Sequence, residues 1–232
     1  MKKIILTVVG ILVIAGGAFA MSDAYVSGTY RYKITVNVQT PDGIKSGSAI
    51  REVTDSETNI KLLDLPDVGS APRIKGEAVV IDLGEKGKLF GLITYDSYYE
   101  LFRAFPFDTG CCESTVEGIK FYNDLEVGQK AELENKKYWP QFVMFEDLSD
   151  PMSVKAVNKE NISEQLGGGY SIQNIMIDVT DEQIRWGISK VLPWIFEYRN
   201  KKFDGQRFQT IKSENKIANS LSAGSFTSGE VR

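Results

Sequence analysis

The residue types that carry most enzymatic chemistry are scarce in this chain. Its 232 residues include no histidine and only two cysteines. Because histidine is the usual general base near neutral pH and a common metal ligand, catalytic triads, Cys/His dyads and histidine-based zinc sites are excluded. Two cysteines are too few for cysteine-rich zinc or iron–sulfur centres. Oxygen-ligated Ca²⁺ or Mg²⁺ is chemically possible, but no EF-hand or phosphate-loop motif is present, and we expect neither a cofactor nor a metal.

The two cysteines, Cys111 and Cys112, are adjacent and are the candidate redox residues. Neighbouring Cα atoms lie about 3.8 Å apart, below the roughly 4.4 Å that a disulfide normally requires. A bridge between them would be strained and therefore easily reduced. Three states are compatible with the sequence: two independent thiols, a strained vicinal disulfide and an intermolecular bridge. We expect the first.

Paired carboxylates are the remaining catalytic option, because burial can separate their pKa values and divide acid and base roles between them. Two acidic groups occur in the sequence, one formed by Glu146, Asp147 and Asp150 and the other by Asp178, Asp181 and Glu182. Asp150 precedes a proline, which is typical of a turn, and the second group lies at the start of a predicted helix, where the helix dipole favours acidic residues. We therefore expect both groups to be structural.

Aromatic residues are concentrated between residues 95 and 107, and a stretch of small residues occupies positions 46–49. Aromatic rings beside a surface that permits close approach could hold a sugar, a peptide or a lipid tail. The alternatives are a buried aromatic stripe and a helix packed across the small residues. The candidate ligand-binding residues are Ser46, Ser48, Tyr95, Tyr98, Tyr99 and Phe102. A second aromatic and basic stretch, residues 186–202, suits either a membrane interface or a helix packed on the sheet, and we expect the helix.

Residues 1–20 have the pattern of an export signal. A basic start at residues 1–3 precedes an apolar run, Ile4–Gly17, and Ala18-Phe19-Ala20 places small residues where a signal peptidase cleaves. The apolar segment is also near the lower length limit for a membrane span, so an uncleaved anchor is the alternative. We expect an exported protein that is periplasmic or secreted, or held at the inner membrane through residues 4–20.

The charge balance argues against nucleic acid as a partner. The chain has 27 Lys and Arg against 31 Asp and Glu, and its net charge is -4. Cleavage after residue 20 would remove two lysines and make the chain more acidic still, and an acidic surface repels a phosphate backbone. The expected partner is an envelope component, namely a peptide, a glycan or a lipid. The sequence does not predict an oligomeric state.

Hydrophobic periodicity predicts two β-hairpins in the first half of the chain. Residues 30–38 alternate bulky and polar side chains, Pro41-Asp42-Gly43 supplies a turn, and residues 44–53 form the returning strand. Residues 78–81 and 89–93 are nearly continuous apolar runs, which predicts a second hairpin covered on both faces.

Helices are predicted between and after these strands. The spacing of Ser97 and Glu100 indicates a capping box, and Pro106 ends that helix. Further helices are expected over residues 113–123, over 158–166 and from Thr180 to Pro193, with short strands over 129–133, 141–145 and 172–178 and a long connection over 54–76. Residues 21–200 are expected to form a single domain, followed over residues 201–232 by a C-terminal hairpin and a loosely ordered tail.

Short motifs resemble a family of small uncharacterised bacterial exported proteins. The similar segments are Tyr30–Val36, Thr40–Gly43, Lys45–Ala49, Ile177–Asp181, Leu192–Trp194 and Ala218–Leu221. They cover about a quarter of the chain. The resemblance implies a bacterial exported setting, and no functional residue is carried over from it.

The sequence thus predicts an α+β fold, in which a mainly antiparallel sheet built from hairpins is covered by three or four helices. The predicted function is that of a non-catalytic binding or scaffold module of the bacterial envelope. The alternative is an envelope enzyme, either a thiol-redox protein or a carboxylate-based hydrolase.

Overall fold

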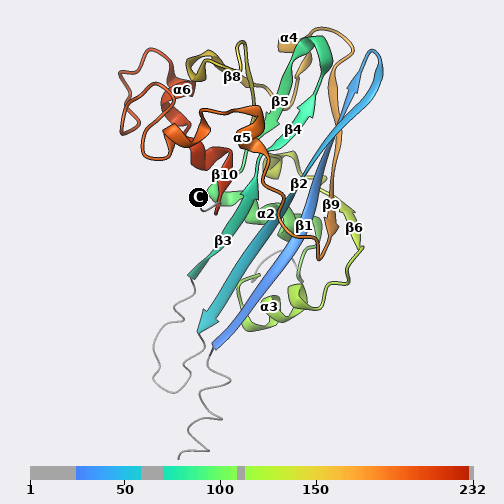
Figure 1. The fold of residues 1–232 in the computed structure, drawn as a ribbon. Helices are drawn as coiled ribbons and strands as arrows, with labels where there is room; N and C mark the ends of the chain where they lie inside the picture. The colour runs from blue at the N-terminus through green and yellow to red at the C-terminus, as the bar shows by residue number, and fades with distance from the viewer. Residues whose placement is uncertain (1–24, 59–69, 109–112, 230–232) are drawn as a thin grey trace, which may run out of the picture.

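The computed structural model describes residues 25–58, 70–108 and 113–229, and antiparallel strands dominate it (Figure 1). The larger sheet has six strands in the order β10-β3-β2-β1-β9-β6, and the smaller has four in the order β4-β5-β7-β8. The larger sheet comprises β1 (Tyr25–Thr40), β2 (Gly43–Thr58), β3 (Ser70–Glu77), β6 (Lys130–Glu132), β9 (Ser171–Val179) and β10 (Thr227–Ser228). The smaller comprises β4 (Val79–Asp82), β5 (Lys88–Gly91), β7 (Phe142–Phe145) and β8 (Val154–Val157).

The hairpin of β1 and β2 spans much of the length of the molecule (Figure 1). Its period-two pattern places one row of large side chains in the interior, namely Tyr30, Tyr32, Ile34, Val36 and Val38. At the turn, Gly43 adopts a φ of 110°, and the Thr40 hydroxyl donates to the Gly43 carbonyl oxygen at 2.7 Å. The predicted first hairpin and its turn are confirmed, and β2 continues five residues beyond the predicted end at Val53.

The smaller sheet lies between two apolar cores. Ile81 and Leu89 pack into the first core together with the inward row of β1. Phe90 belongs to the second core, which includes Phe203 and Phe226 from the C-terminal part of the chain. β4 and β5 are therefore covered on both faces. This accounts for their nearly continuous runs of apolar residues. The predicted second hairpin, covered on both faces, is confirmed.

The expectation of an α+β sheet covered by three or four helices is wrong, because the described chain is rich in β-structure and its helices are short. Its five α-helices have four to eight residues: α2 (Tyr99–Ala104), α3 (Val116–Asn123), α4 (Ser163–Leu166), α5 (Ile188–Val191) and α6 (Lys216–Ser220). Such helices bury little area. The inward face of the larger sheet is therefore covered by the smaller sheet at one end, while α2 and α3 pack at the other (Figure 1).

The helix predicted from Thr180 to Pro193 is reduced to the single turn of α5. Residues 180–187 have no regular structure, and the helix begins only after Gly187. The carboxylate of Glu77, which lies at the end of β3, accepts hydrogen bonds from the backbone N–H groups of Gly187 at 2.6 Å and Ile188 at 3.0 Å. An acidic group from a distant strand thus caps this helix, and this contact fixes where it starts.

The helix predicted around Ser97 is present, but its predicted capping box is wrong. A 3₁₀ turn, η3 (Tyr95–Tyr98), precedes α2, and the Thr94 N–H donates to the Ser97 hydroxyl at 3.0 Å. Ser97 therefore serves as the third residue of a capping box that starts at Thr94. Glu100 is directed into the interior and does not cap the helix.

The C-terminal region is more ordered than the sequence suggests. Its turn at Gly205 is present, but no hairpin forms there. Residues 213–229 include α6 and β10, and Phe226 is fully buried. β10 pairs with β3 through Thr227 opposite Glu77. The long connection expected over residues 54–76 is likewise partly strand, because it includes the end of β2 and most of β3.

A buried ion pair joins the two sheets and α2. The Nη1 atom of Arg51 on β2 lies 2.5 Å from both carboxylate oxygens of Glu100 on α2. The Nη2 atom of Arg51 donates to the carbonyl oxygens of Gly91 at 3.3 Å and Leu92 at 3.2 Å, at the end of β5. The Tyr32 hydroxyl donates to Glu100 at 2.9 Å. Burial raises the pKa of the Glu100 carboxyl, whereas the charge of Arg51 and these hydrogen bonds lower it.

Replacement of Glu100 by alanine should destabilise the protein strongly. The change leaves the fully buried Arg51 without its counter-ion, and breaking a buried pair in this way costs about 3–5 kcal/mol. Urea unfolding would measure the loss. The matched control is Glu182→Ala, which removes an exposed pair with Arg185 and should cost about 0–1 kcal/mol. Equal losses in the two variants would contradict this role for Arg51.

Candidate functional site

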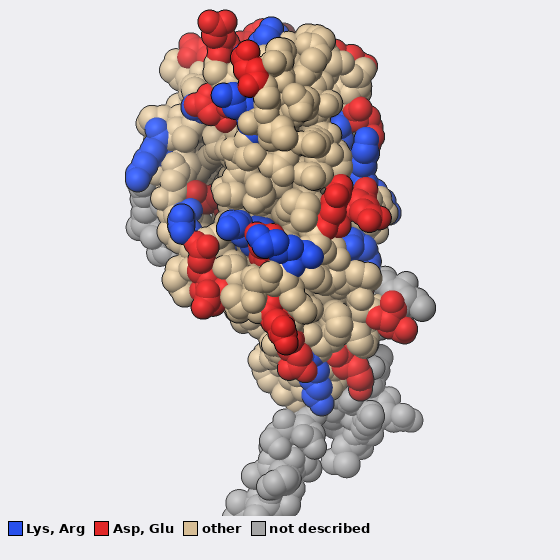
Figure 2. Space-filling model, turned by 90° about the vertical axis from the view of Figure 1, so that its right-hand side faces the viewer, with Lys and Arg blue, Asp and Glu red and all other residues tan. Residues whose placement is uncertain are grey.

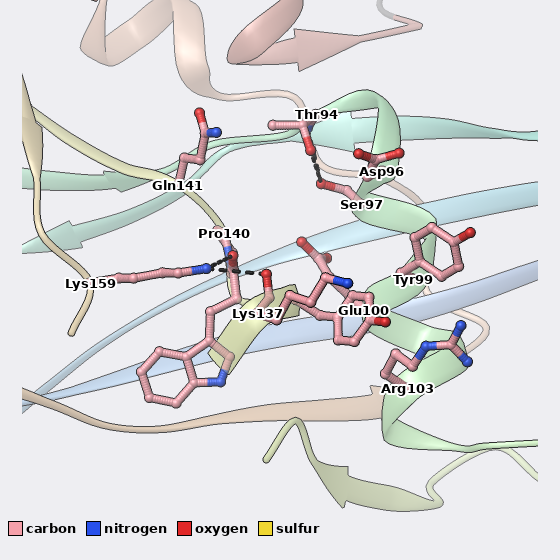
Figure 3. Close-up of a pocket in the computed structure, with 12 residues that line it drawn as sticks. Thr94, Asp96, Ser97, Tyr99, Glu100, Arg103, Lys137, Pro140, Gln141 and Lys159 are labelled. Atoms are coloured by element: carbon pink, nitrogen blue, oxygen red, sulfur yellow. Dashed lines mark hydrogen bonds between the residues drawn. The ribbon is translucent and has the colours of Figure 1, made fainter. Parts of the chain in front are cut away.

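A pocket of about 360 Å³ lies between the segment containing α2 and the segment that precedes β7 (Figure 3). One wall comes from residues 94–103 and the other from residues 137–141. Lys159 reaches the pocket from the loop that follows β8 (Figure 3). Three segments that are distant in sequence therefore meet at one site.

Arg103 is held in a fixed position on the α2 wall. Its guanidinium carbon lies 5.0 Å from the ring centroid of Tyr99 and 5.2 Å from that of Tyr138. Its Nη1 atom also forms an ion pair with Glu113, just before α3. Cation–π contacts and a carboxylate together restrict the rotamers of this side chain. A planar cation is thus positioned at the pocket before any ligand binds.

Two lysines add positive charge on the opposite side. The Lys159 ammonium donates to the backbone carbonyl oxygens of Lys137 and Trp139, both at 3.2 Å (Figure 3). Burial lowers the pKa of Lys159, and the nearby Glu160 opposes this change. Lys137 is exposed, with its Nζ atom 5.4 Å from the centroid of the Tyr138 ring. The site therefore combines three basic side chains with aromatic rings.

The acidic side chains that line the pocket do not balance these cations. Asp96 and Glu100 are the carboxylates among its lining residues. Glu100 is paired with Arg51 and Arg103 is paired with Glu113, so Asp96 alone among the lining carboxylates is left to oppose the two lysines. Figure 2 shows basic and acidic side chains interspersed over one face of the molecule, and the whole chain has a net charge of -4. The excess of positive charge at the pocket is local, and it favours an anionic ligand.

The structure separates the six candidate ligand-binding residues. Tyr99 lines the pocket described above, whereas Tyr98 and Phe102 are buried in the first core. Tyr95 is exposed and lines a different depression, beside β3. Ser46 donates to the Asn37 side chain at 2.6 Å, and Ser48 lines a third depression, beside Glu77. The rings of Tyr98 and Tyr99 lie 4.4 Å apart between centroids, and Tyr99 is the one of the two that lines this pocket.

Sequence reasoning did not find Arg103, Lys137, Tyr138 or Lys159. The run Lys136-Lys137-Tyr138-Trp139 is a visible cluster of basic and aromatic residues. Its relation to Tyr99 depends on tertiary packing, however, since Tyr99 and Tyr138 lie 5.6 Å apart between ring centroids. The sequence is therefore sufficient to select residues 136–139 as a candidate binding segment, but it does not show that this segment lies beside Tyr99.

The small-residue stretch at positions 46–49 accommodates a strand. A Cβ atom added to Gly47 would lie 2.2 Å from the carbonyl oxygen of Val80 on β4. The predicted close approach is therefore present, although the approaching element is neither the expected helix nor a ligand. Gly47 allows the smaller sheet to lie directly against β2.

The variant Gly47→Ala should lower the free energy of unfolding by about 1–3 kcal/mol, because the added methyl group would displace the backbone of β4. Gly224→Ala is the matched control, since its added Cβ would meet only the Ser222 hydroxyl at 3.8 Å and no backbone atom. Thermal and urea unfolding would compare them. A loss at position 47 no larger than that at position 224 would contradict the close contact.

The acidic groups considered for catalysis have local structural contacts. Asp147 accepts hydrogen bonds from the N–H and hydroxyl of Ser149, and Asp150 accepts from the Met152 N–H. Asp178 pairs with Lys130 at 2.9 Å, and Glu182 pairs with Arg185. Among residues 25–58, 70–108 and 113–229, no cluster of three or more carboxylates or thiols could hold a metal ion. The candidate redox residues Cys111 and Cys112 lie outside the described residues.

Asp55 is a buried carboxylate on β2 that interacts electrostatically with Glu113, the ion-pair partner of Arg103. Its Oδ1 atom accepts from the Ser56 N–H at 2.8 Å, while its Oδ2 atom has no partner within the described structure. Burial raises the pKa of Asp55, the negative charge of Glu113 raises it further, and hydrogen bonds from Ser114 and Ser56 lower it. Glu113 is also the partner of Arg103. The net direction is upward, so folding favours the protonated form.

The variant Asp55→Asn should stabilise the protein at neutral pH. The ordinary pKa of this carboxyl group is 3.8, and folding raises it. Such a group stabilises the fold at pH values below 3.8, and this contribution is lost as the pH rises through the pKa of the folded state. The gain should therefore be present near pH 7 and absent at pH below that ordinary value. Thermal melts across this range would measure it. A variant that is less stable than the wild type at pH 7 would contradict the cost of burying this charge.

Comparisons with known proteins add no further assignment: no protein-family model matches the sequence, and neither a curated protein nor a solved structure matches the chain. Within the described residues, none of the helices has the length and apolar composition needed to cross a bilayer. Residues 1–20, which carry the predicted export signal, lie outside them.

Proposed function

We propose that the protein is a non-catalytic binding module of the bacterial envelope that holds an anionic ligand in the pocket between α2 and residues 137–141. The observation that carries this proposal is the convergence of Arg103, Lys137 and Lys159 on one pocket of a chain whose net charge is -4. Cations that are held close together repel one another and lose part of their hydration. A bound anionic ligand offsets both costs.

The position of Arg103 supports binding. Its guanidinium is fixed by Tyr99 and Tyr138 and by the Glu113 carboxylate. A planar fork that is already ordered loses little entropy when it binds a carboxylate in a bidentate manner. Lys137 is exposed and offers a second point charge on a flexible side chain. The pocket therefore combines a rigid anchor with an adjustable one.

The rest of the lining favours a carboxylate-bearing glycan. Gln141 and Thr94 offer neutral hydrogen-bonding groups, and the tyrosines offer apolar ring surface beside the cations. Sugars present hydroxyl groups and apolar C–H faces in alternation, and such a mixed lining matches both. A setting in the bacterial envelope, as the N-terminal pattern predicts, would expose the protein to acidic glycans.

The test is a titration with an oligosaccharide of N-acetylglucosamine and N-acetylmuramic acid, followed by calorimetry and by the intrinsic fluorescence of a variant that retains Trp139, which lines the pocket, as its single tryptophan. Lys137→Ala should weaken binding by roughly tenfold, since a hydrogen bond to a charged group contributes about 1.5–3 kcal/mol and 1.4 kcal/mol corresponds to a factor of ten. High salt should weaken binding of the wild type as well.

Two controls define the result. Lys86→Ala removes an exposed lysine in the turn between β4 and β5, which is not a lining residue of the pocket, and should leave affinity unchanged. The same oligosaccharide with its carboxyl groups reduced to alcohols should bind more weakly than the acidic form. If neither sugar binds, or if both bind equally well and Lys137→Ala has no effect, the proposed site is wrong. Binding of acidic peptides alone would retain the pocket and exclude a glycan.

A further inference from the structure

A loop at the C-terminal end of the fold presents two large apolar side chains to solvent. This loop, residues 204–213, lies between Phe203 and α6. Phe208 is 70% exposed and Ile211 is 92% exposed, the highest values among the large apolar side chains in the described part of the chain. Isolated exposed apolar residues are common in proteins. Two in one loop, with the highest exposed fractions of the large apolar side chains described, form a candidate contact surface.

The fold holds this loop in a defined shape. Asn219 on α6 is fully buried, and its side-chain oxygen accepts from the Thr210 N–H at 2.6 Å. The Asn219 amide donates to the Phe208 carbonyl oxygen at 3.3 Å. Both polar groups of a buried side chain are thus used to support the loop beneath its tip.

The base of the loop is closed as well. The Asp204 carboxylate accepts from the Ser213 hydroxyl at 3.0 Å and from the Gln206 N–H at 3.0 Å. A loop whose ends are joined in this way is ordered before it binds. Its loss of conformational entropy on binding is therefore small. Phe208 and Ile211 are therefore presented by a built support rather than left at the end of a loose segment.

Basic residues flank the two apolar residues in the sequence. The Arg207 guanidinium carbon lies 5.1 Å from the ring centroid of Phe208, and Lys212 follows Ile211 directly. Just before the loop in the sequence, Arg199 and Lys201 follow the 3₁₀ turn η6 (Ile195–Tyr198), and they lie over the rings of Phe196 and Tyr198, respectively. Between residues 197 and 217 the sequence has six Lys and Arg against three Asp and Glu, the reverse of the balance in the whole chain.

We propose that this loop docks the protein on the surface of a bilayer that contains anionic phospholipid. Phe208 and Ile211 enter the boundary between headgroups and acyl chains, and Arg207 and Lys212 meet the lipid phosphates. Apolar side chains flanked by cations are the combination that binds an anionic interface. A bilayer accommodates a convex loop without a preformed groove, and the positive charge selects an anionic surface.

The test uses the full-length protein and hydrogen–deuterium exchange with mass spectrometry, which reports on the loop separately from residues 1–20. Vesicles of phosphatidylcholine mixed with phosphatidylglycerol should protect residues 204–213, and vesicles of phosphatidylcholine alone should protect them much less. In Phe208→Ser/Ile211→Ser the partition of the loop into anionic vesicles should fall by about tenfold or more, because two large apolar side chains no longer leave water.

Matched controls separate this effect from a general loss of surface hydrophobicity. Ile44→Ser/Val127→Ser changes two other exposed apolar residues, which are 55% and 64% exposed, and should leave the loop protected. Arg207→Glu/Lys212→Glu should remove the preference for anionic vesicles. Absence of protection at residues 204–213 in every vesicle, or equal protection in the wild type and the Phe208/Ile211 variant, would overturn the proposal. Protection by a second copy of the chain without vesicles would instead assign the loop to a protein interface.

Discussion

The fold depends on a charge buried where its layers meet. Arg51 on β2 and Glu100 on α2 are both almost wholly inaccessible. A buried charge is costly unless every hydrogen-bonding group nearby is satisfied. The guanidinium meets this demand by bonding to the end of β5, to the Glu77 carbonyl oxygen and to Glu100. Because these partners belong to different elements, the larger sheet, the smaller sheet and α2 must assemble together for the charge to be accommodated.

The apolar cores on either side of the smaller sheet follow from the same arrangement. β4 approaches β2 closely at Gly47, so the smaller sheet covers the upper part of the hairpin. Its other face is then left to the C-terminal part of the chain, which supplies Phe203 and Phe226. The short helices contribute single buried side chains or pairs of buried side chains to these cores. The candidate pocket lies beside α2.

Features set by local sequence could be predicted, whereas those set by distant contacts could not. The period of β1 and the turn at Gly43 are local, and both were predicted correctly. Glu100 has the spacing of a capping residue, and only Arg51, 49 positions away, shows its real role. The start of α5 similarly depends on Glu77. β3 is not predicted because proline and glycine residues, including Pro72, argue against a strand. Pro72 lies beyond the two residues that pair with β10, and the pairing of β3 with β2 shifts register there, between Thr54 and Ser56.

The candidate site shows the same division. The sequence predicts both Tyr98 and Tyr99 as candidate contacts, and the structure shows that Tyr99 lines the pocket whereas Tyr98 is buried. Arg103, Tyr138 and Lys159 come from segments whose meeting is decided by packing, and the cation–π contacts of Arg103 have no sequence signature. The exposure of Phe208 was also unexpected, since the residue had been placed in a hairpin.

Glu77 has a consequence for how the protein loses its structure. Its carbonyl oxygen bonds to the buried Arg51, and its carboxylate caps α5, which packs in the second core. One residue thus belongs to both halves of the hydrophobic interior. Separation of the C-terminal segment from the smaller sheet would release α5 and loosen the surroundings of Arg51 at the same time. The two cores should therefore melt in a single calorimetric transition, with equal van't Hoff and calorimetric enthalpies.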